Sequence, residues 1–486
     1  MRMAKRVSPE AITERRLRTQ TGQWTALALA SALLLAACSD KRPPVGEIGA
    51  VVGHIGGIAT DEPHAAVVGQ DVLSAGGTAT DAAIAAFFTL TVTYPVGAGI
   101  GGGGICIAYD AKSNEAQTLE FLAGSPATPG PFAVPGAVRG LAALHARYGR
   151  VGWGGLVAPA EKMARFGHSM SRALVSRLHE ADAAGLLTPG VRQKYARGDG
   201  SLKGEGEKQV DFELAGMLSR IRALGAGTIY GGQAGRQLVD AAEAAGGSLT
   251  LDDLRAYRPV WRQTGTLKFG DERGHIALPP PQGGAVLFEL LEALRPTRTR
   301  SDEARLLAAT EKIYASLGPG PQAPAGDAVI VAGDREGSAV ACAFSMGTPF
   351  GAGRLAQDVG VLMAPVAGRE QAFLAPMLVA NHNINQGYLA IAASGGQTAP
   401  IATALVALAL LEDGAELKAA MAASRAARLR PEGPLIRDDG GRSGPSAQSL
   451  GNVQAVWCPN GLQRGPSTCG YASDPRGHGL ARGQAF

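Results

Sequence analysis

Charge is scarce in this sequence: only 18% of its 486 residues are Asp, Glu, Lys or Arg. Soluble proteins usually hold about a quarter, so the composition argues against a disordered chain. The net charge of +4 lies in residues 1–37, which carry six basic and two acidic side chains, and the remainder is balanced at 40 of each. A neutral body lacks the basic face that binds nucleic acid, so no nucleic-acid partner is expected.

Several functional motifs are also missing. The sequence has no GxxxxGK[ST] phosphate loop, no HExxH, no paired CxxC and no GxSxG elbow, and its eight histidines are scattered. Gly97, Gly99 and Gly102 fit the letters of a dinucleotide fingerprint, but strand-like residues follow them where that site needs a helix. We therefore expect neither a cofactor nor a metal ion.

No apolar run reaches the roughly 18 residues that a membrane span requires. A shorter run, Trp24–Ala37, follows a basic stretch as in a signal peptide, and Leu35–Cys38 resembles a bacterial lipobox. The resemblance implies a signal peptide at 1–37, a lipid anchor on Cys38 and a tether at 38–48. It places the chain in the cell envelope, on the periplasmic side of a Gram-negative outer membrane. An ordinary signal peptide with an incidental cysteine is the alternative.

Only four cysteines remain beyond that position. Cys106 and Cys342 lie in apolar, strand-like runs, and we expect them to be small buried thiols. Cys458 and Cys469 lie in a polar stretch rich in glycine and proline, where a disulfide is plausible in an exported protein. Two free loop thiols are the alternative.

From residue 49 onward the sequence divides into three parts that differ in composition and in predicted secondary structure. Residues 49–317 are helix-rich, 318–326 form a linker of Gly, Pro and Ala, and 327–486 hold short β-like runs. We expect the two parts to share one core in a layered α+β or α/β architecture. Helices are predicted over 65–73, 79–92, 137–148, 156–165, 170–183, 214–224, 233–245, 285–294, 302–316 and 401–411. Strands are predicted over 105–110, within 266–278, and over 328–332, 339–344, 359–363, 377–380 and 388–393.

Seven segments follow one another in a fixed order along the chain. They are Gly76–Ala83; Gly99–Gly104; Ala133–Gly136 with Tyr148 and Gly149; Gly246 and Gly247 with Leu249–Leu254 and Tyr257; Pro279–Gly284; Ser394–Gly396; and Ala472–Arg476. In this order they resemble the gamma-glutamyltransferase (glutathione hydrolase) family. The resemblance implies the N-terminal-nucleophile hydrolase fold, an α/β four-layer αββα sandwich. Members of that family are made as one chain that cuts itself between its helix-rich and strand-rich parts. The new terminal threonine is then the nucleophile, with its own amine as base.

The resemblance fails at the nucleophile. The family segment begins with that threonine and continues to an Asp-x-x-Gly-Asn-Ala-Val pattern. In this sequence Asp334, Gly337 and Ala339 match the Asp, Gly and Ala of that pattern and so fix the alignment. Asp327 then stands in the nucleophile's place, and no Ser, Thr or Cys lies between Gly318 and Asp334. We therefore expect a chain that is not cleaved.

The positions that hold the substrate in the family differ as well. Leu122 replaces the arginine whose guanidinium group would bind a substrate carboxylate. An aliphatic side chain cannot make the two parallel hydrogen bonds of that group. Ala364 begins the stretch that replaces the amine-binding run, and Ala372 and Phe373 replace the paired serines. Among the family's site positions, a catalytic role stays plausible for Ser345 and for the oxyanion glycines Gly395 and Gly396.

Three hypotheses follow. The leading one is a family member without γ-glutamyl transfer or glutathione hydrolysis, acting as a binding or interaction module or vestigial. The second is an active amidase in which Asp327, Ser345 or Thr348 works while Gly395 and Gly396 polarise the carbonyl. The third is ordinary glutathione hydrolysis through a non-standard residue. The sequence identifies neither a small-molecule ligand nor a protein partner.

Overall fold

A computed structural model describes residues 55–278, 282–295, 303–317, 325–356, 359–366, 373–430, 432–439, 450–463 and 466–483. The predicted signal peptide, Cys38, the tether, the prolines 279–281, most of the linker and Ala372 lie outside these residues.

The larger of two sheets holds seven antiparallel strands. Strands from before and after the predicted linker pair with one another in it, so the helix-rich and strand-rich parts build one sheet together. Its strands, in spatial order, are β19 (Leu480–Gly483), β1 (Gly56–Thr60), β9 (Gly326–Asp334), β10 (Ala339–Gly347), β2 (Gly103–Asp110), β3 (Glu115–Phe121) and β6 (Val260–Gln263).

The second sheet holds six antiparallel strands and likewise combines both parts of the chain. Its order is β18 (Gly470–Ser473), β17 (Asn452–Trp457), β14 (Gln386–Ser394), β13 (Met377–Asn381), β8 (Glu272–Ile276) and β7 (Gly265–Phe269). Three small ribbons pair β4 (His168–Ser169) with β5 (Lys208–Gln209), β11 (Leu355–Ala356) with β12 (Val361–Leu362), and β15 (Arg425–Ala427) with β16 (Ile436–Asp438).

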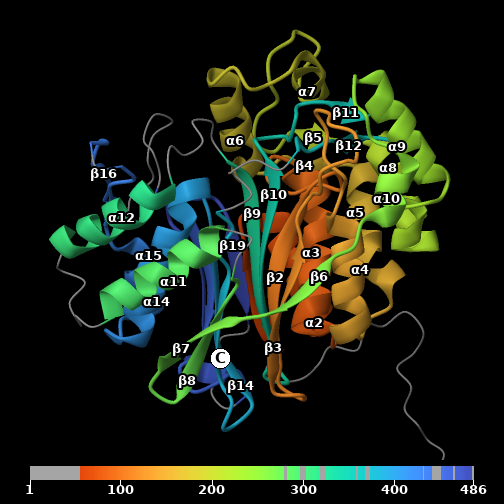
Figure 1. Ribbon diagram of the computed structural model, residues 1–486. Coiled ribbons are helices and arrows are strands. Elements are labelled where there is room, and N and C mark those ends of the chain that lie inside the picture. Colours follow the sequence, from red (N-terminus) through yellow and green to blue (C-terminus); the bar gives the residue numbers. More distant parts are fainter. Residues whose placement is uncertain are drawn as a thin grey trace, which may run out of the picture. The chain divides into compact units, whose positions relative to one another are not determined.

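Helices cover the outer face of each sheet, which gives four layers (Figure 1). On the first sheet lie α2 (Pro63–Ser74), α3 (Ala79–Thr93), α4 (Ala137–Tyr148) and α5 (Trp153–Phe166), and on the second α11 (Gln282–Leu294), α12 (Glu303–Leu317), α14 (Ala399–Leu411) and α15 (Leu417–Ala422). The remaining helices are α6 (Arg172–Ala183), α7 (Pro189–Lys194), α8 (Phe212–Leu224), α9 (Gln233–Ala244), α10 (Leu251–Ala256) and the short 3₁₀ turns η1 (Ala226–Thr228), η3 (Gly396–Thr398) and η4 (Pro466–Thr468).

Strand β9 shows why these layers form. Its residues are all buried, and they alternate between two hydrophobic clusters. Ile330 and Ala332 pack with α3 in the cluster beneath the first helix layer, whereas Val329 and Val331 pack between the two sheets. Side chains on a strand alternate between its faces, so a strand covered on both sides reads as a continuous apolar run.

Helix α3 matches the helix predicted over 79–92, and each of its 15 residues is buried. Thr78 and Asp81 form a capping box at its start: the N–H of Asp81 donates to the Thr78 hydroxyl and the N–H of Thr78 donates to the Asp81 carboxylate. Such a box satisfies amide groups that would otherwise be unpaired inside the core.

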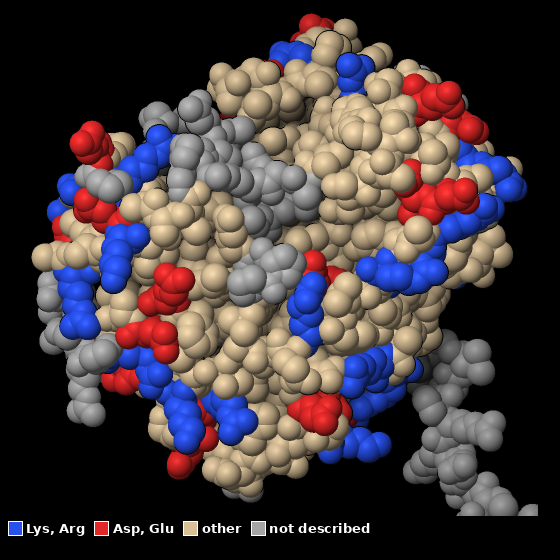
Figure 2. Space-filling view, viewed as in Figure 1, with Lys and Arg blue, Asp and Glu red and all other residues tan. Residues whose placement is uncertain are grey.

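Surface charges of both signs are interspersed on the face shown in Figure 2, in keeping with the balanced charge of the body. Among the described residues, no helix is long and apolar enough to cross a bilayer.

Candidate functional site

Asp327 is the second residue of β9 and is almost completely buried. It lies opposite Ser345 on β10. A Cβ at Gly97 would lie 2.1 Å from the carbonyl oxygen of Asp327. The glycine run that resembles a dinucleotide fingerprint thus begins with a close approach between two backbones, for which the absence of a side chain is needed.

The Asp327 carboxylate is bound by two successive backbone amides. The N–H of Gly395 donates to Oδ2 at 3.0 Å and to Oδ1 at 3.2 Å, and the N–H of Gly396 donates to Oδ2 at 2.9 Å. Both glycines have positive φ, +131° and +59°, which other residues adopt at a cost. This backbone conformation aims both amides at one point and forms an anion-binding nest.

A second carboxylate, Asp61, lies beside this nest in the segment before α2. It accepts hydrogen bonds from the Val329 amide at 2.8 Å, the Gln454 side chain at 3.0 Å and the Ser394 hydroxyl at 3.2 Å. Burial raises the pKa of Asp61 to about 7, and the charge of Asp327 contributes to that rise. A carboxyl group with such a pKa can exchange a proton near neutral pH.

Arg177 on α6 supplies positive charge near these two carboxylates. It donates to the Ala325 carbonyl at 2.8 Å, two residues before Asp327, and to Glu180 at 2.7 Å. Burial raises the pKa of Asp327, but its two amide donors and the charge of Arg177 oppose that rise. Nothing in the sequence singles out Asp61 or Arg177, because only the pairing of distant segments brings them to β9.

The hydroxyl groups of Ser345 and Thr348, near Asp327, form hydrogen bonds with backbone groups. Ser345 donates to the Gly326 carbonyl at 3.3 Å and accepts from the Gly347 amide at 2.9 Å, and Thr348 donates to the Gly351 carbonyl at 2.6 Å. The Asp327 carboxylate therefore occupies both amides of the Gly395–Gly396 pair, and the two hydroxyls bond to backbone of their own segment.

A family model described as Gamma-glutamyltranspeptidase matches residues 65–318, just over half of the chain. This chain belongs to the gamma-glutamyltranspeptidase family. It is 33% identical over 271 residues to glutathione hydrolase 3 of Arabidopsis thaliana, a match covering 52% of this chain and 42% of the relative. It is 31% identical over 305 residues to the glutathione hydrolase proenzyme of Bacillus subtilis strain 168, covering 55% and 50%. The chain thus spans about half the length of these curated relatives.

Structural similarity to known proteins covers more of the chain than these sequence matches do. A cephalosporin acylase from Bacillus halodurans superposes with a TM-score of 0.71 at 20% identity, over 91% of this chain and 98% of the acylase. The predicted N-terminal-nucleophile hydrolase fold, with two antiparallel sheets flanked by helices, is confirmed.

The described positions at which the sequence predicts replaced substrate-binding residues pack in or against three separate hydrophobic clusters. Leu122 is half-buried and packs against the cluster between the sheets. Ala364 lies in the cluster of the first helix layer, and its carbonyl accepts from the Ala133 amide at 3.0 Å. Phe373 packs in the cluster beneath the second helix layer, where its ring stacks on that of Tyr314 with centroids 6.1 Å apart. In this family member these side chains contribute to the core.

Two disulfides are present in the described residues of this gamma-glutamyltranspeptidase-family chain. Cys458 and Cys469 are joined next to the β17–β18 pair. The expectation of two separate thiols at Cys106 and Cys342 is wrong, because these cysteines lie directly opposite each other on β2 and β10 and form a disulfide. They are 236 residues apart in the sequence, and nothing in either strand indicates the pairing.

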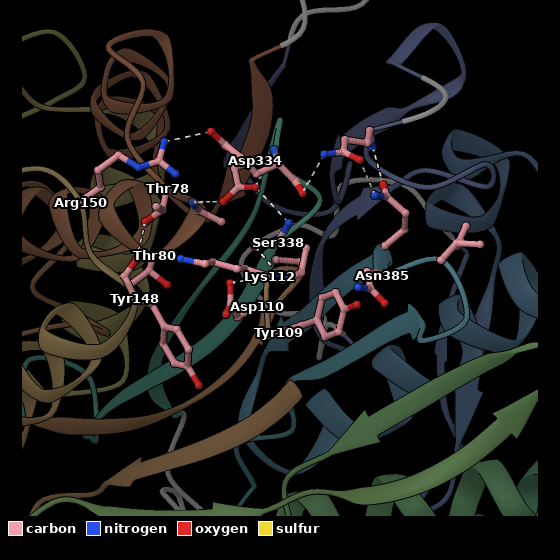
Figure 3. A pocket seen from close by; sticks show the side chains of 17 residues that line it. Thr78, Thr80, Tyr109, Asp110, Lys112, Tyr148, Arg150, Asp334, Ser338 and Asn385 are labelled. Carbon is pink, nitrogen blue, oxygen red and sulfur yellow. Dashed lines mark hydrogen bonds and ion pairs between the residues drawn. The ribbon is translucent and has the colours of Figure 1, made fainter. Parts of the chain in front are cut away.

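A cavity of about 360 Å³ lies at the opposite end of β9 from Asp327 (Figure 3). Asp334 at its wall accepts from the backbone amides of Ala79, Glu336 and Ser338, so this carboxylate fixes the turn after β9. Six residues of β9 lie between Asp327 and Asp334, whose Cα atoms are therefore roughly 23 Å apart, so this cavity is separate from the Asp327 site. Within the described residues, no group of three His, Cys, Asp or Glu side chains is arranged to hold a metal ion.

Proposed function

We propose that this chain is a gamma-glutamyltranspeptidase-family protein that neither cleaves itself nor transfers or hydrolyses γ-glutamyl groups. The observation that carries the proposal is the Asp327 carboxylate bound by the Gly395 and Gly396 amides. By its register with the family pattern, Asp327 takes the place of the nucleophilic threonine. A carboxylate there offers no hydroxyl for self-cleavage, and it occupies the donors that an oxyanion would need.

Other residues support the loss of this activity. No Ser, Thr or Cys lies between Gly318 and Asp334, so no shift of register supplies a nucleophile. Leu122 and Phe373 take part in hydrophobic packing where the family pattern has an arginine and a serine. Residues of a catalytic site commonly reduce stability, so their exchange for apolar side chains is expected when selection for catalysis ends. The remaining role is that of a binding or interaction module.

Intact mass and activity together test the proposal. The purified full chain should give one mass that spans residues 326 and 327. At high protein concentration it should release p-nitroaniline from γ-glutamyl-p-nitroanilide no faster than buffer. The Bacillus subtilis glutathione hydrolase proenzyme, assayed in parallel, serves as the positive control.

Two stable fragments meeting near residue 327 would contradict the proposal, as would p-nitroaniline release in proportion to the amount of protein. Release that disappears in Asp327→Ala but persists in Asp71→Ala would instead assign catalysis to the carboxylate of Asp327. Asp71 is exposed on α2 and is therefore a suitable control.

We also propose that the chain is a lipoprotein held at the periplasmic face of a Gram-negative outer membrane through Cys38. The apolar run before Leu35–Cys38 supports this localisation. The disulfides Cys106–Cys342 and Cys458–Cys469 support an oxidising compartment.

Cys38→Ser should therefore move the protein from the membrane fraction to the soluble fraction, because the sulfur that carries the lipid is gone. The measurement is fractionation of the host's cells with an antibody against the chain. Cys458→Ser, which keeps Cys38, should stay in the membrane fraction. Membrane association of Cys38→Ser equal to that of the parent would refute the anchor.

A further inference from the structure

A serine, a histidine and a glutamate outside the Asp327 site form a chain of contacts. Glu62 precedes α2 and His64 lies in its first turn, whereas Ser169 lies on β4, more than a hundred residues later. The His64 Nδ1 lies 2.7 Å from the Glu62 Oε1, and the His64 Nε2 lies 3.5 Å from the Ser169 Oγ. This is the order acid, base, hydroxyl that activates a serine in hydrolases on unrelated folds.

The glutamate is held as an ionised acceptor. Its side chain is fully buried and also accepts from the Thr93 hydroxyl at 2.7 Å and the Ala65 amide at 3.0 Å. Burial opposes ionisation, but the hydrogen bonds, that from His64 foremost, outweigh it and lower the pKa of Glu62. A carboxylate at Nδ1 fixes the tautomer in which Nε2 is unprotonated and faces Ser169.

The histidine is placed to accept a proton. The hydrogen bond with Glu62 raises the pKa of His64, which is only partly buried. The ring of His168 meets the ring of His64 edge-on with centroids 5.8 Å apart. Burial lowers the pKa of His168 to about 4, so this neighbour is neutral at pH 7 and does not repel a protonated His64.

The serine is accessible to a substrate. Ser169 is exposed and lines a cavity of about 690 Å³ between the segment that joins β4 to α6 and the loop Ser473–Gly479. Ser171 and Arg172, at the start of α6, line the same cavity. The first amides of a helix have no acceptor within it, so the amides of Arg172 and Ala173 at the start of α6 can serve as donors for an oxyanion.

The geometry points to a second, hydrolytic site in which Ser169 is the nucleophile, His64 the general base and Glu62 a positioning residue. Its substrates would be short-chain carboxylic esters. The open cavity suits small acyl groups, and an alkoxide is a better leaving group than the amine of an amide. This site shares no residue with the Asp327 site and does not depend on the function proposed for it.

The reaction needs only an ester and water. The Ser169 Oγ bonds to the acyl carbon while its proton passes to the His64 Nε2. The bond from carbon to the alkoxy oxygen breaks, and the alcohol leaves with that proton. Water then attacks the acyl-serine, His64 takes the water's proton and returns it to the Ser169 Oγ, and the carboxylic acid is released.

Ester hydrolysis by the full chain tests this site. We expect turnover of p-nitrophenyl acetate and covalent labelling of Ser169 by a fluorophosphonate, located by peptide mass. Ser169→Ala and His64→Gln should each lower the rate by about 100-fold or more. Ser201→Ala is the matched control: Ser201 is also exposed, but its hydroxyl donates to Asp199 at 2.7 Å and has no histidine partner. This control should keep the parent rate.

The variant Glu62→Gln distinguishes a positioning role of Glu62 in catalysis from a purely structural role in folding. The titratable groups that face His64 are Glu62 and His168, so loss of the carboxylate should lower the pKa that governs the rate, which a purely structural defect would not do. Equal melting temperatures of Ser169→Ala and the parent would show that the variant is folded. No hydrolysis above buffer by the parent, an unchanged rate in Ser169→Ala, or labelling at another serine would each overturn the proposal.

Discussion

Asp474→Ala should lower the free energy of unfolding by about 3–5 kcal/mol, because it leaves buried arginines without their carboxylate. Asp474 contacts Arg425 at 2.6 Å and Arg476 at 3.2 Å, and its Oδ2 also accepts from the Val453 amide at 3.1 Å. The three ionic side chains are at most 2% exposed. Asp438, 2.7 Å from Arg476, would be the remaining acid partner of that arginine.

Urea unfolding followed by circular dichroism measures this loss. Glu303→Ala is the matched control, because it breaks an ion pair with Arg437 in which both side chains are largely exposed. Exposed pairs contribute less than about 1 kcal/mol, so this variant should unfold close to the parent. A loss below 1 kcal/mol in Asp474→Ala would show that the arginines find other partners or reach water.

This network gives a physical reason for a motif that the sequence offered only by resemblance. Ala472–Arg476 is the last of the seven matching segments. In the structure, Asp474 pairs with Arg425 on β15 and Arg476 pairs with Asp438 on β16, which connects the end of β18 to both strands. Buried charges need partners, so a fixed Asp-Pro-Arg sequence can be a requirement of the fold without any catalytic role.

The fold was predictable to the extent that its signals are local. The apolar residues of α3 and its capping box predict a buried helix, and the continuous apolar run of β9 predicts a strand covered on both faces. The order of the strands depends on contacts between distant segments. The Cys106–Cys342 disulfide shows the limit, since two apolar runs do not reveal that they pair.

The candidate site was predictable only where a register could be fixed. The family pattern around Asp334 and Gly337 predicts that Asp327 stands in the position of the nucleophile, and Ser394–Gly396 predicts the pair of amides. The contact between Asp327 and those amides was not expected, because it depends on the positive φ of both glycines. Nothing in the sequence indicated a site role for Asp61. An acidic residue just before a helix commonly caps that helix, and in the structure the cap of α2 is the neighbouring Glu62.

Asp61→Asn should make the protein more stable at pH 8 by about 2–4 kcal/mol and leave its stability at pH 4 nearly unchanged. Burial raises the pKa of Asp61 to about 7, whereas an unfolded aspartate has a pKa of about 3.9. The folded state therefore binds this proton more tightly. Its stability falls as the pH rises from about 4 to 7, and the full loss of about 4 kcal/mol is present above pH 7.

The site can accommodate the amide. The Asp61 carboxylate accepts from the Val329 amide and the Gln454 side chain, while the Gln454 Oε1 is buried without a hydrogen-bond partner in the described structure. In Asp61→Asn, the side-chain oxygen can keep the bond from Val329. A rotated Gln454 can then accept from the new amide group, and the Ser394 hydroxyl, which donates to the same carboxylate oxygen, can turn to accept from that group as well. The Gln454 side-chain N–H loses its acceptor, which places the expected gain below the full 4 kcal/mol.

Urea unfolding between pH 4 and pH 8 tests this prediction against the control Asp71→Asn, which makes the same exchange at an exposed position on α2. The control should follow the pH dependence of the parent. The stability of Asp61→Asn should rise relative to the parent most steeply between pH 4 and pH 7. If Asp61→Asn is destabilised equally at both ends of this range, folding does not raise the pKa of Asp61, and the prediction is wrong. The pair of buried acids beside β9 would then be held at no cost in stability.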